Sequence, residues 1–73
     1  MKPVCQHDLT DWEIEPGLSI SFDNGDVGLV ESDGVGMQLL VSSDGETWYK
    51  HCHTTRSQHV MRCIIYTYPS DEL

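Results

Sequence analysis

Basic residues are scarce in this chain. Its 73 residues include four Lys and Arg against twelve Asp and Glu, which gives a formal net charge of −8 at pH 7. None of the four cations lies between Asp8 and Glu46, a stretch that carries ten of the carboxylates. Four cations neutralise too few phosphates for strong nucleic-acid binding, so direct nucleic-acid binding is disfavoured. A surface of one sign instead favours association with an oppositely charged partner.

Long apolar runs and abundant cysteines are also lacking. No apolar run approaches the roughly 18 residues that a membrane span needs. The segment from Met1 to Asp8 lacks the apolar region of a secretory signal. We therefore expect a cytoplasmic protein that does not associate with a membrane. The three cysteines, Cys5, Cys52 and Cys63, are too few and odd in number for a disulfide framework.

The size and the apolar content indicate one small domain. A chain of this length buries only about 60% of the surface that its unfolded form exposes. Hydrophobic residues make up 38% of the chain and are spread along it, which argues against a disordered acidic tail. We therefore expect a single small acidic β domain over residues 1–73.

The first candidate strand is the segment Asp11–Glu15. Acidic and apolar residues alternate in it, and a period of two predicts a half-buried strand with Trp12 and Ile14 facing inward. Pro16-Gly17 is expected to end this strand.

Two hairpins follow, each with an Asx-Gly turn. Asn24-Gly25 and Asp44-Gly45 are the turn pairs, and such pairs accept the positive φ that tight hairpins require. The predicted strands are 18–22 with 27–30, and 37–41 with 47–50.

The last third of the chain has no clear helical pattern by this reading. Residues 51–59 are polar and are expected to form a long loop with at most one helical turn. Residues 60–68 are rich in β-branched and aromatic side chains, which predicts a final strand ended by Pro69. The expected core is Trp12, Ile14, Leu18, Ile20, Phe22, Leu29, Leu39, Val41, Trp48, Val60, Cys63 or Ile64, and Tyr66.

These elements together predict an all-β fold. Five or six short strands at spacings near ten residues are typical of a small antiparallel barrel, SH3-like or OB-like, or of a strongly twisted sheet with little or no helix. A closed barrel is favoured because closure removes strand edges.

The candidate partner-binding residues are the carboxylates on predicted strand exteriors and turns. They are Asp11, Glu13, Glu15, Asp23, Asp26, Glu31 and Asp33. A surface that serves solubility alone is the competing interpretation. Mimicry of nucleic acid would need several acidic columns side by side. Carboxylates on one strand are about 6.7 Å apart, whereas duplex DNA has one charge per roughly 1.7 Å.

The composition therefore favours a small acidic protein–protein interaction module and not an enzyme. We expect an inhibitor that occupies a basic surface of a larger protein, such as the nucleic-acid-binding surface of a nucleic-acid enzyme. A phage origin would fit such a protein by analogy only. A structural or assembly component is a further alternative.

A zinc-stabilised module is the main alternative. Zinc takes four thiolate or imidazole ligands, and the chain offers enough of them. The spacing lacks a Cys-x-x-Cys knuckle, so we expect no metal and no cofactor. The simpler interpretation makes Cys63 a small buried hydrophobe. The candidate ligand set is Cys5, His7, Cys52 and Cys63, or a variant with His53 or His59.

Covalent chemistry is the weakest alternative. Cys52 and His59 are the candidates for a thiol nucleophile and its base. Such a pair needs a third group that orients the base, and the sequence does not identify one.

One turn resembles a known motif. The segment Ser42–Trp48 resembles the Ser-x-Asp-Gly-x-x-Trp turn of discoidin-like carbohydrate-binding modules and the Asp-box of sialidase-type propellers. In those families the Asp and Ser hold the turn. The resemblance covers seven residues and implies turn geometry rather than sugar binding.

Overall fold

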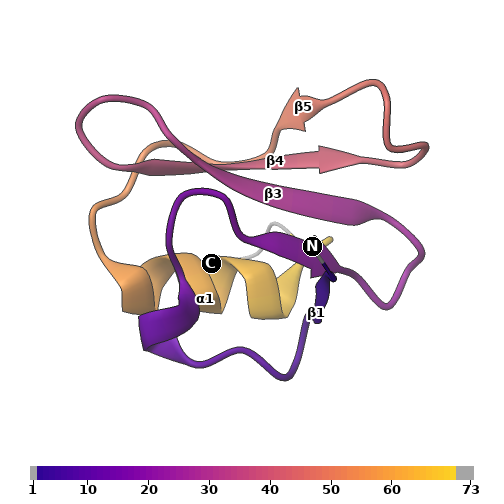
Figure 1. The fold of residues 1–73 in the computed structure, drawn as a ribbon, viewed down its shortest axis with the longest axis horizontal. Helices are drawn as coiled ribbons and strands as arrows, with labels where there is room; N and C mark the ends of the chain where they lie inside the picture. The colour runs from indigo at the N-terminus through magenta and orange to yellow at the C-terminus, as the bar shows by residue number, and fades with distance from the viewer. Residues whose placement is uncertain (1, 71–73) are drawn as a thin grey trace.

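A computed structural model describes residues 2–70 as one open five-stranded sheet with a helix packed beneath it (Figure 1). The strand order is β1-β2-β3-β4-β5. The elements in chain order are β1 (Val4–Cys5), the 3-10 helix η1 (Asp11–Glu13), β2 (Ser19–Ser21), β3 (Val27–Ser32), β4 (Met37–Ser42), β5 (Tyr49–Lys50) and α1 (Gln58–Thr67).

The sheet is mixed and it does not close. Strands β2 to β5 form an antiparallel meander, whereas β1 pairs in parallel with β2 through Val4↔Ile20. A sheet-rich fold with five strands is confirmed, but two of the predicted strands are helical, β1 lies outside the predicted strands, and the closed and wholly antiparallel barrel is wrong. The edge strands β1 and β5 have two residues each. Such short edges offer little template for pairing with another chain, so closure is not needed to protect them.

Both predicted hairpins are present. In the first, Phe22 N–H donates to Asp26 O at 3.0 Å, and Gly25 has φ +96° at the turn. In the second, Asp44 Oδ1 accepts the N–H groups of Glu46 and Thr47 at 2.8 and 3.0 Å. The turn geometry that the Ser42–Trp48 resemblance implied is therefore confirmed, with a side-chain oxygen holding the backbone.

A turn and a bulge lead into β2. Leu18 N–H donates to Glu15 O at 3.1 Å, with Pro16 and Gly17 at the centre of the turn. Gly17 has φ +100°, which only glycine adopts readily. Gly17 N–H then donates to Val30 O, and Val30 N–H donates to Leu18 O. This is the pattern of a glycine-type β-bulge, and it sets how the chain leaves η1.

The predicted strand over residues 60–68 is wrong, because Gln58–Thr67 forms α1. Ser57 caps the helix, since its hydroxyl oxygen accepts Val60 N–H at 3.1 Å. The apolar residues Met61, Ile64, Ile65 and Tyr68 lie at i, i+3, i+4 and i+7, and Met61 and Ile65 are fully buried. The β-branched composition predicts a strand, but a helix buries all four of these apolar side chains, wholly or partly, against the sheet.

The predicted strand at Asp11–Glu15 is also wrong. Thr10 N–H and Thr10 hydroxyl both donate to Glu13 Oε1 at 2.8 Å, which closes η1 as a single 3-10 turn. A Thr three residues before a Glu is a helix-start signal, and it prevails here over the alternation. Ile14 is buried as expected, whereas Trp12 is 74% exposed.

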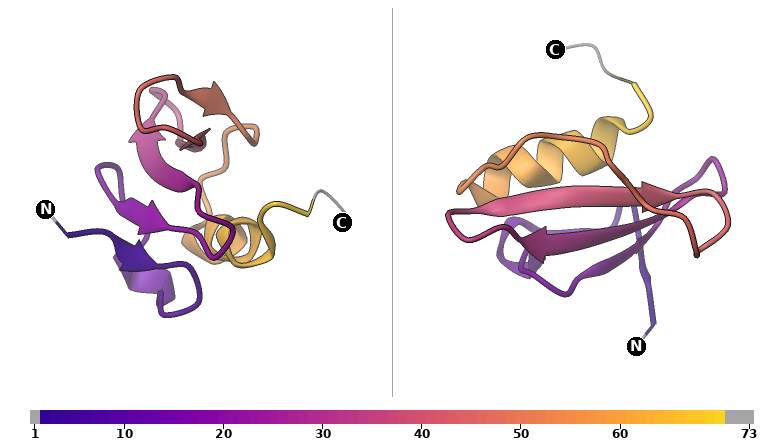
Figure 2. Two further views of the ribbon diagram at one scale, coloured as in Figure 1. Left: turned by 90° about the vertical axis from the view of Figure 1, so that its right-hand side faces the viewer. Right: turned by 90° about the horizontal axis from the view of Figure 1, so that it is seen from above.

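The core lies between α1 and one face of the sheet (Figure 2). Among the predicted core residues, Ile14, Ile20, Phe22, Leu39 and Val41 are confirmed as buried. Full burial of each such side chain contributes about 1.5–3 kcal/mol. The residues that the helix and η1 redirect to solvent are Trp12, Val60, Cys63 and Tyr66, and Trp48 is also exposed. The buried residues that the sequence reading missed are Leu9, Val30, Met37, Met61 and Ile65.

A buried amide ties the C-terminal end of α1 to the sheet. Gln6 is 3% exposed, and its Nε2 donates to Ile65 O at 2.9 Å and to Tyr68 O at 2.7 Å. Its Oε1 accepts Asp23 N–H at 3.0 Å. The last carbonyls of a helix have no partners within the helix, so this side chain satisfies groups that would otherwise be unpaired.

Candidate functional site

The topology separates the turns into two opposite ends of the sheet (Figures 1 and 2). We call the η1 end the one with η1, the 15–18 turn, the β3–β4 turn and the start of α1. We call the Gln6 end the one with the β2–β3 and β4–β5 turns, Gln6 and the last turn of α1. Figure 1 shows the η1 end on the left and the Gln6 end on the right.

The seven candidate partner-binding carboxylates divide between these ends. The structure brings five of them to the η1 end and does not bring all seven together. The five at the η1 end are Asp11, Glu13, Glu15, Glu31 and Asp33, and the two at the Gln6 end are Asp23 and Asp26.

Several of these carboxylates accept hydrogen bonds that stabilise local turns. Thr10 N–H chiefly lowers the pKa of Glu13 by donating to its carboxylate. Asp33 Oδ1 accepts Val35 N–H at 3.2 Å and Gly36 N–H at 3.1 Å in the β3–β4 turn. Glu13 and Asp33 therefore stabilise local turns, whereas the sequence predicted that they bind a partner.

The two carboxylates at the Gln6 end also have partners. Asp23 Oδ2 lies 3.1 Å from His7 Nε2, and Asp26 accepts the hydroxyl of Tyr68. By contrast, Glu15 and Glu31 are exposed, and neither side chain has an ion pair or hydrogen bond among residues 2–70. These two are therefore the freest of the seven candidates.

Trp12 is the most exposed large apolar side chain of the described residues. It lies between Asp11 and Glu13, and the side-chain bonds of both neighbours hold η1 in place. A shallow hollow of about 270 Å³ lies beside η1, and its lining is Glu13, Glu15, Pro16, Gly17 and Leu18.

Three contacts fasten η1 to the start of α1. Asp11 accepts a hydrogen bond from Arg62 Nε through Oδ1, and its Oδ2 lies 3.2 Å from His59 Nδ1. Gln58 Nε2 donates to Ile14 O at 2.9 Å. The pKa of Asp11 is lowered chiefly by the hydrogen bond from Arg62, with a smaller effect of His59.

A cysteine completes this group. His59 Nε2 lies 3.7 Å from Cys63 Sγ, one helical turn further along α1. The predicted partner of His59 is Cys52, but the thiol that contacts His59 is that of Cys63. The i, i+4 spacing of the two residues would have indicated this contact if the helix had been recognised.

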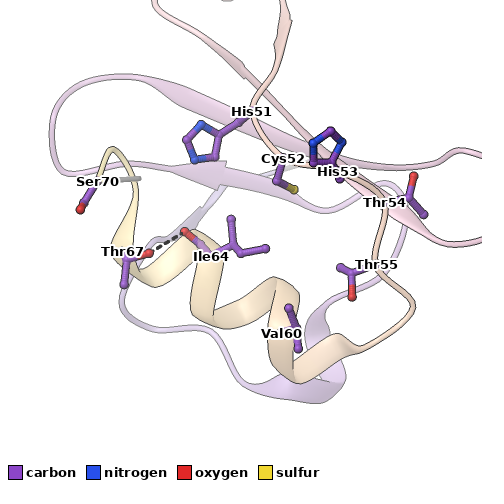
Figure 3. Close-up of a pocket in the computed structure, with 9 residues that line it drawn as sticks. All are labelled: His51, Cys52, His53, Thr54, Thr55, Val60, Ile64, Thr67 and Ser70. Carbon is purple, nitrogen blue, oxygen red and sulfur yellow. Dashed lines mark hydrogen bonds between the residues drawn. The ribbon is translucent and has the colours of Figure 1, made fainter. Parts of the chain in front are cut away.

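A mostly apolar hollow lies between α1 and the segment that follows β5 (Figure 3). Its volume is about 330 Å³, and Figure 3 shows Val60 and Ile64 of α1 on one side and Cys52 on the other. Burial raises the pKa of the Cys52 thiol. None of the lining residues is an Asp, Glu, Lys or Arg, so the titratable lining side chains are two histidines and Cys52. The remaining lining residues are His51, His53, Thr54, Thr55, Thr67 and Ser70.

The candidate zinc ligands are not brought together. Within residues 2–70, no group of three or more His, Cys, Asp or Glu side chains could hold a metal ion. Cys63 and Asp11 approach opposite nitrogens of His59, so they cannot share an ion with that ring. The set Cys5, His7, Cys52 and Cys63 therefore does not form a zinc site in the described part of the chain.

Comparison with protein-family models, curated proteins and solved structures gives no match to this chain. None of the helices within residues 2–70 combines the length and apolarity that crossing a bilayer requires.

Proposed function

We propose that this protein is an acidic interaction module that binds a basic surface of a larger protein through its η1 end. The observation that carries the proposal is Trp12, which is 74% exposed on a turn fastened from both sides. Tryptophan is enriched among the residues that dominate binding energy at interfaces. A rigid support also reduces the ordering cost of binding.

The surroundings of Trp12 favour a cationic partner. The face of an indole attracts Lys and Arg through its quadrupole. Glu15 and Glu31, which have no partners among the described residues, add negative charge at the same end. The hollow beside Glu13 and Glu15 has room for the aliphatic stem of a Lys or Arg side chain.

Inhibition follows if the partner uses that basic surface for nucleic acid. The module would then compete with phosphates for the same Lys and Arg side chains. The division of the carboxylates between two ends weakens mimicry of a continuous phosphate backbone, so we confine the proposal to the η1 end. We expect fast, salt-sensitive association, because rim carboxylates act mainly on the on-rate.

The test compares matched variants in affinity capture and in binding to the captured partner. Trp12→Ala and Glu15→Lys should abolish or strongly weaken binding. Tyr49→Ala and Glu46→Lys are the controls, since they remove an exposed aromatic group and reverse a carboxylate at the other end of the sheet. Raising the ionic strength from about 0.05 to about 0.5 M should release the wild-type partner, because screening weakens exposed charge pairs.

The outcomes distinguish binding at a defined site from attraction by the net charge of the protein. Equal loss for Glu15→Lys and Glu46→Lys would show that only the net charge matters. Binding that is indifferent to salt and to Trp12→Ala would contradict the proposal. A Lys-rich peptide titrated into the Trp48→Phe protein gives a direct second measurement, because only Trp12 then reports by fluorescence.

A further inference from the structure

Three side chains at the junction of η1 and α1 are arranged in a line. Cys63 Sγ lies 3.7 Å from His59 Nε2, and Asp11 Oδ2 lies 3.2 Å from the other ring nitrogen, Nδ1. His59 and Cys63 are four residues apart on α1, so the helix places them on one face. Asp11 arrives from η1, and Arg62 holds its second oxygen.

The contact with Asp11 determines the tautomer of His59, and so which ring nitrogen can accept the proton of the Cys63 thiol. The pKa of Asp11 is lowered, so its carboxylate is ionised and can only accept a hydrogen bond. His59 Nδ1 must therefore carry the hydrogen in the neutral ring. The lone pair of Nε2 then points to Cys63 and can take the thiol proton.

The geometry points to Cys63 as a reactive thiol that forms mixed disulfides with small disulfides, with His59 as its base and Asp11 as a positioning residue. The thiol proton passes to His59 Nε2, and Sγ attacks one sulfur of the disulfide. The sulfur–sulfur bond of the reagent breaks as the bond to Cys63 forms. The released thiolate takes the proton from His59 and leaves as a thiol, so atoms and electrons balance.

The surroundings favour a disulfide that carries a carboxylate. A shallow hollow of about 370 Å³ adjoins the thiol, lined by Arg62, Cys63, Tyr66 and Thr67. Among the described residues, Arg62 donates only through Nε, so its terminal nitrogens are available to an anion. We therefore assign the site to a low-molecular-weight disulfide with a carboxylate near the sulfur.

The other two cysteines serve as internal controls. Cys5 is exposed, but its thiol has no hydrogen bond to a histidine among residues 2–70. Cys52 is half-buried, and burial raises the pKa of its thiol, so less of it is thiolate. The expected order of reactivity is therefore Cys63, then Cys5, then Cys52.

The groups that face the thiol come from two elements. Asp11 belongs to η1, whereas His59, Arg62 and Tyr66 belong to α1. The ring of His7 contacts Tyr66 with centroids 4.5 Å apart. Asp11 is the one carboxylate of this cluster, and it is paired with Arg62. No unpaired carboxylate of the cluster therefore opposes the negative charge that forms on Cys63 when its proton moves to His59.

The test uses two single-cysteine proteins. One keeps Cys63 (Cys5→Ser, Cys52→Ser) and the other keeps Cys5 (Cys52→Ser, Cys63→Ser). Dithiodipyridine is a suitable probe, because it is neutral and the protein's charge of −8 does not repel it. At pH 7 we expect Cys63 to react about five- to tenfold faster than Cys5, because His59 Nε2 is placed to take the thiol proton.

His59→Gln should bring Cys63 to within about twofold of Cys5. His59 is exposed, so this change should leave the fold intact, and far-ultraviolet circular dichroism checks that it does. Asp11→Asn should reduce the advantage and shift its pH profile. Equal rates for Cys63 and Cys5 at all pH values would overturn the inference. So would a Cys63 rate that His59→Gln leaves unchanged.

Two further measurements isolate the folded cluster. In denaturant the rates of the two proteins should converge, and a persistent Cys63 advantage would assign it to the neighbouring sequence and overturn the inference. Oxidised glutathione carries carboxylates, so Arg62→Gln should slow it more than dithiodipyridine. Equal slowing of both would overturn the assignment of the carboxylate-bearing disulfide. Neither Trp12 nor Glu15 belongs to the thiol cluster, so their variants test partner binding separately.

Discussion

The two ends of the sheet are held together in different ways. At the Gln6 end, a buried amide satisfies the last carbonyls of α1 and one N–H of the β2–β3 turn. Aromatic rings pack beside it, with Phe22 and Tyr68 centroids 4.2 Å apart. At the η1 end, the ties are partly exposed side chains, such as Arg62 on Asp11 and Gln58 on the carbonyl of Ile14.

This difference separates stability from availability. Buried hydrogen bonds are costly to break, because each unpaired group stays out of water. Exposed ion pairs contribute little to the free energy of unfolding, about 0–1 kcal/mol each. Trp12, Glu15 and the Cys63 thiol can therefore be exposed near the η1 end at little cost to the free energy of unfolding. The buried hydrogen bonds at the Gln6 end contribute more to that free energy.

The largest expected effect comes from a matched pair of glutamine substitutions. Gln6→Ala should lower the free energy of unfolding by about 2–3 kcal/mol, because buried backbone groups lose their partners. Gln58→Ala removes one bond at the exposed end and should cost about 0.5–1 kcal/mol. Urea unfolding of both variants measures the two values. Equal losses would contradict the distinction between the ends.

A smaller effect is expected from Tyr68→Phe. The change keeps the ring that packs on Phe22 and removes the hydroxyl that donates to Asp26. We expect a loss of about 1 kcal/mol in the same urea measurement. If the hydroxyl is worth as much as Gln6, the buried amide is not the main tie at that end.

The smallest effect concerns the β4–β5 turn and pH. The N–H groups of Thr47 and Glu46 lower the pKa of Asp44 below its ordinary value of 3.8, so the folded state favours the ionised carboxylate. Its stabilisation is therefore present above pH 4 or so and is lost as the pH falls through the lowered pKa. The difference in melting temperature between wild type and Asp44→Ala should shrink in acid.

Glu46→Ala is the control for that experiment, because Glu46 has no side-chain bond among the described residues of the same turn. Its melting difference from wild type should be small at every pH. A difference for Asp44→Ala that is constant from neutral pH to acid would mean that the ionised carboxylate does not hold the turn.

Parts of the fold were predictable where local signals agreed. Asn24-Gly25 and Asp44-Gly45 lie between alternating segments, and both hairpins formed as expected. Local signals conflict at Asp11–Glu15, where the alternation predicts a strand and the start signal of Thr10 and Glu13 predicts a helical turn. They conflict again at residues 60–68, where the β-branched composition predicts a strand and the spacing of Met61, Ile64, Ile65 and Tyr68 fits a helix.

The candidate site was harder to predict than the fold. The acidic residues were identifiable from charge alone, but their internal partners were not. Asp11 and Arg62 are 51 residues apart in the chain, and Gln6 and Ile65 are 59 apart. No local pattern reports such contacts, so the roles of Asp11, Gln6 and Cys63 required the packed structure.

The sequence by itself determined the charge, the two hairpin turns and the apolar residues of the central strands, because these depend on composition and on neighbours two to four residues apart. Only the tertiary structure decided that the last segment is a helix, that Trp12 faces solvent and that His59 lies between Asp11 and Cys63. Each of these depends on which apolar surface α1 buries against the sheet, and that choice is made by packing across the whole chain.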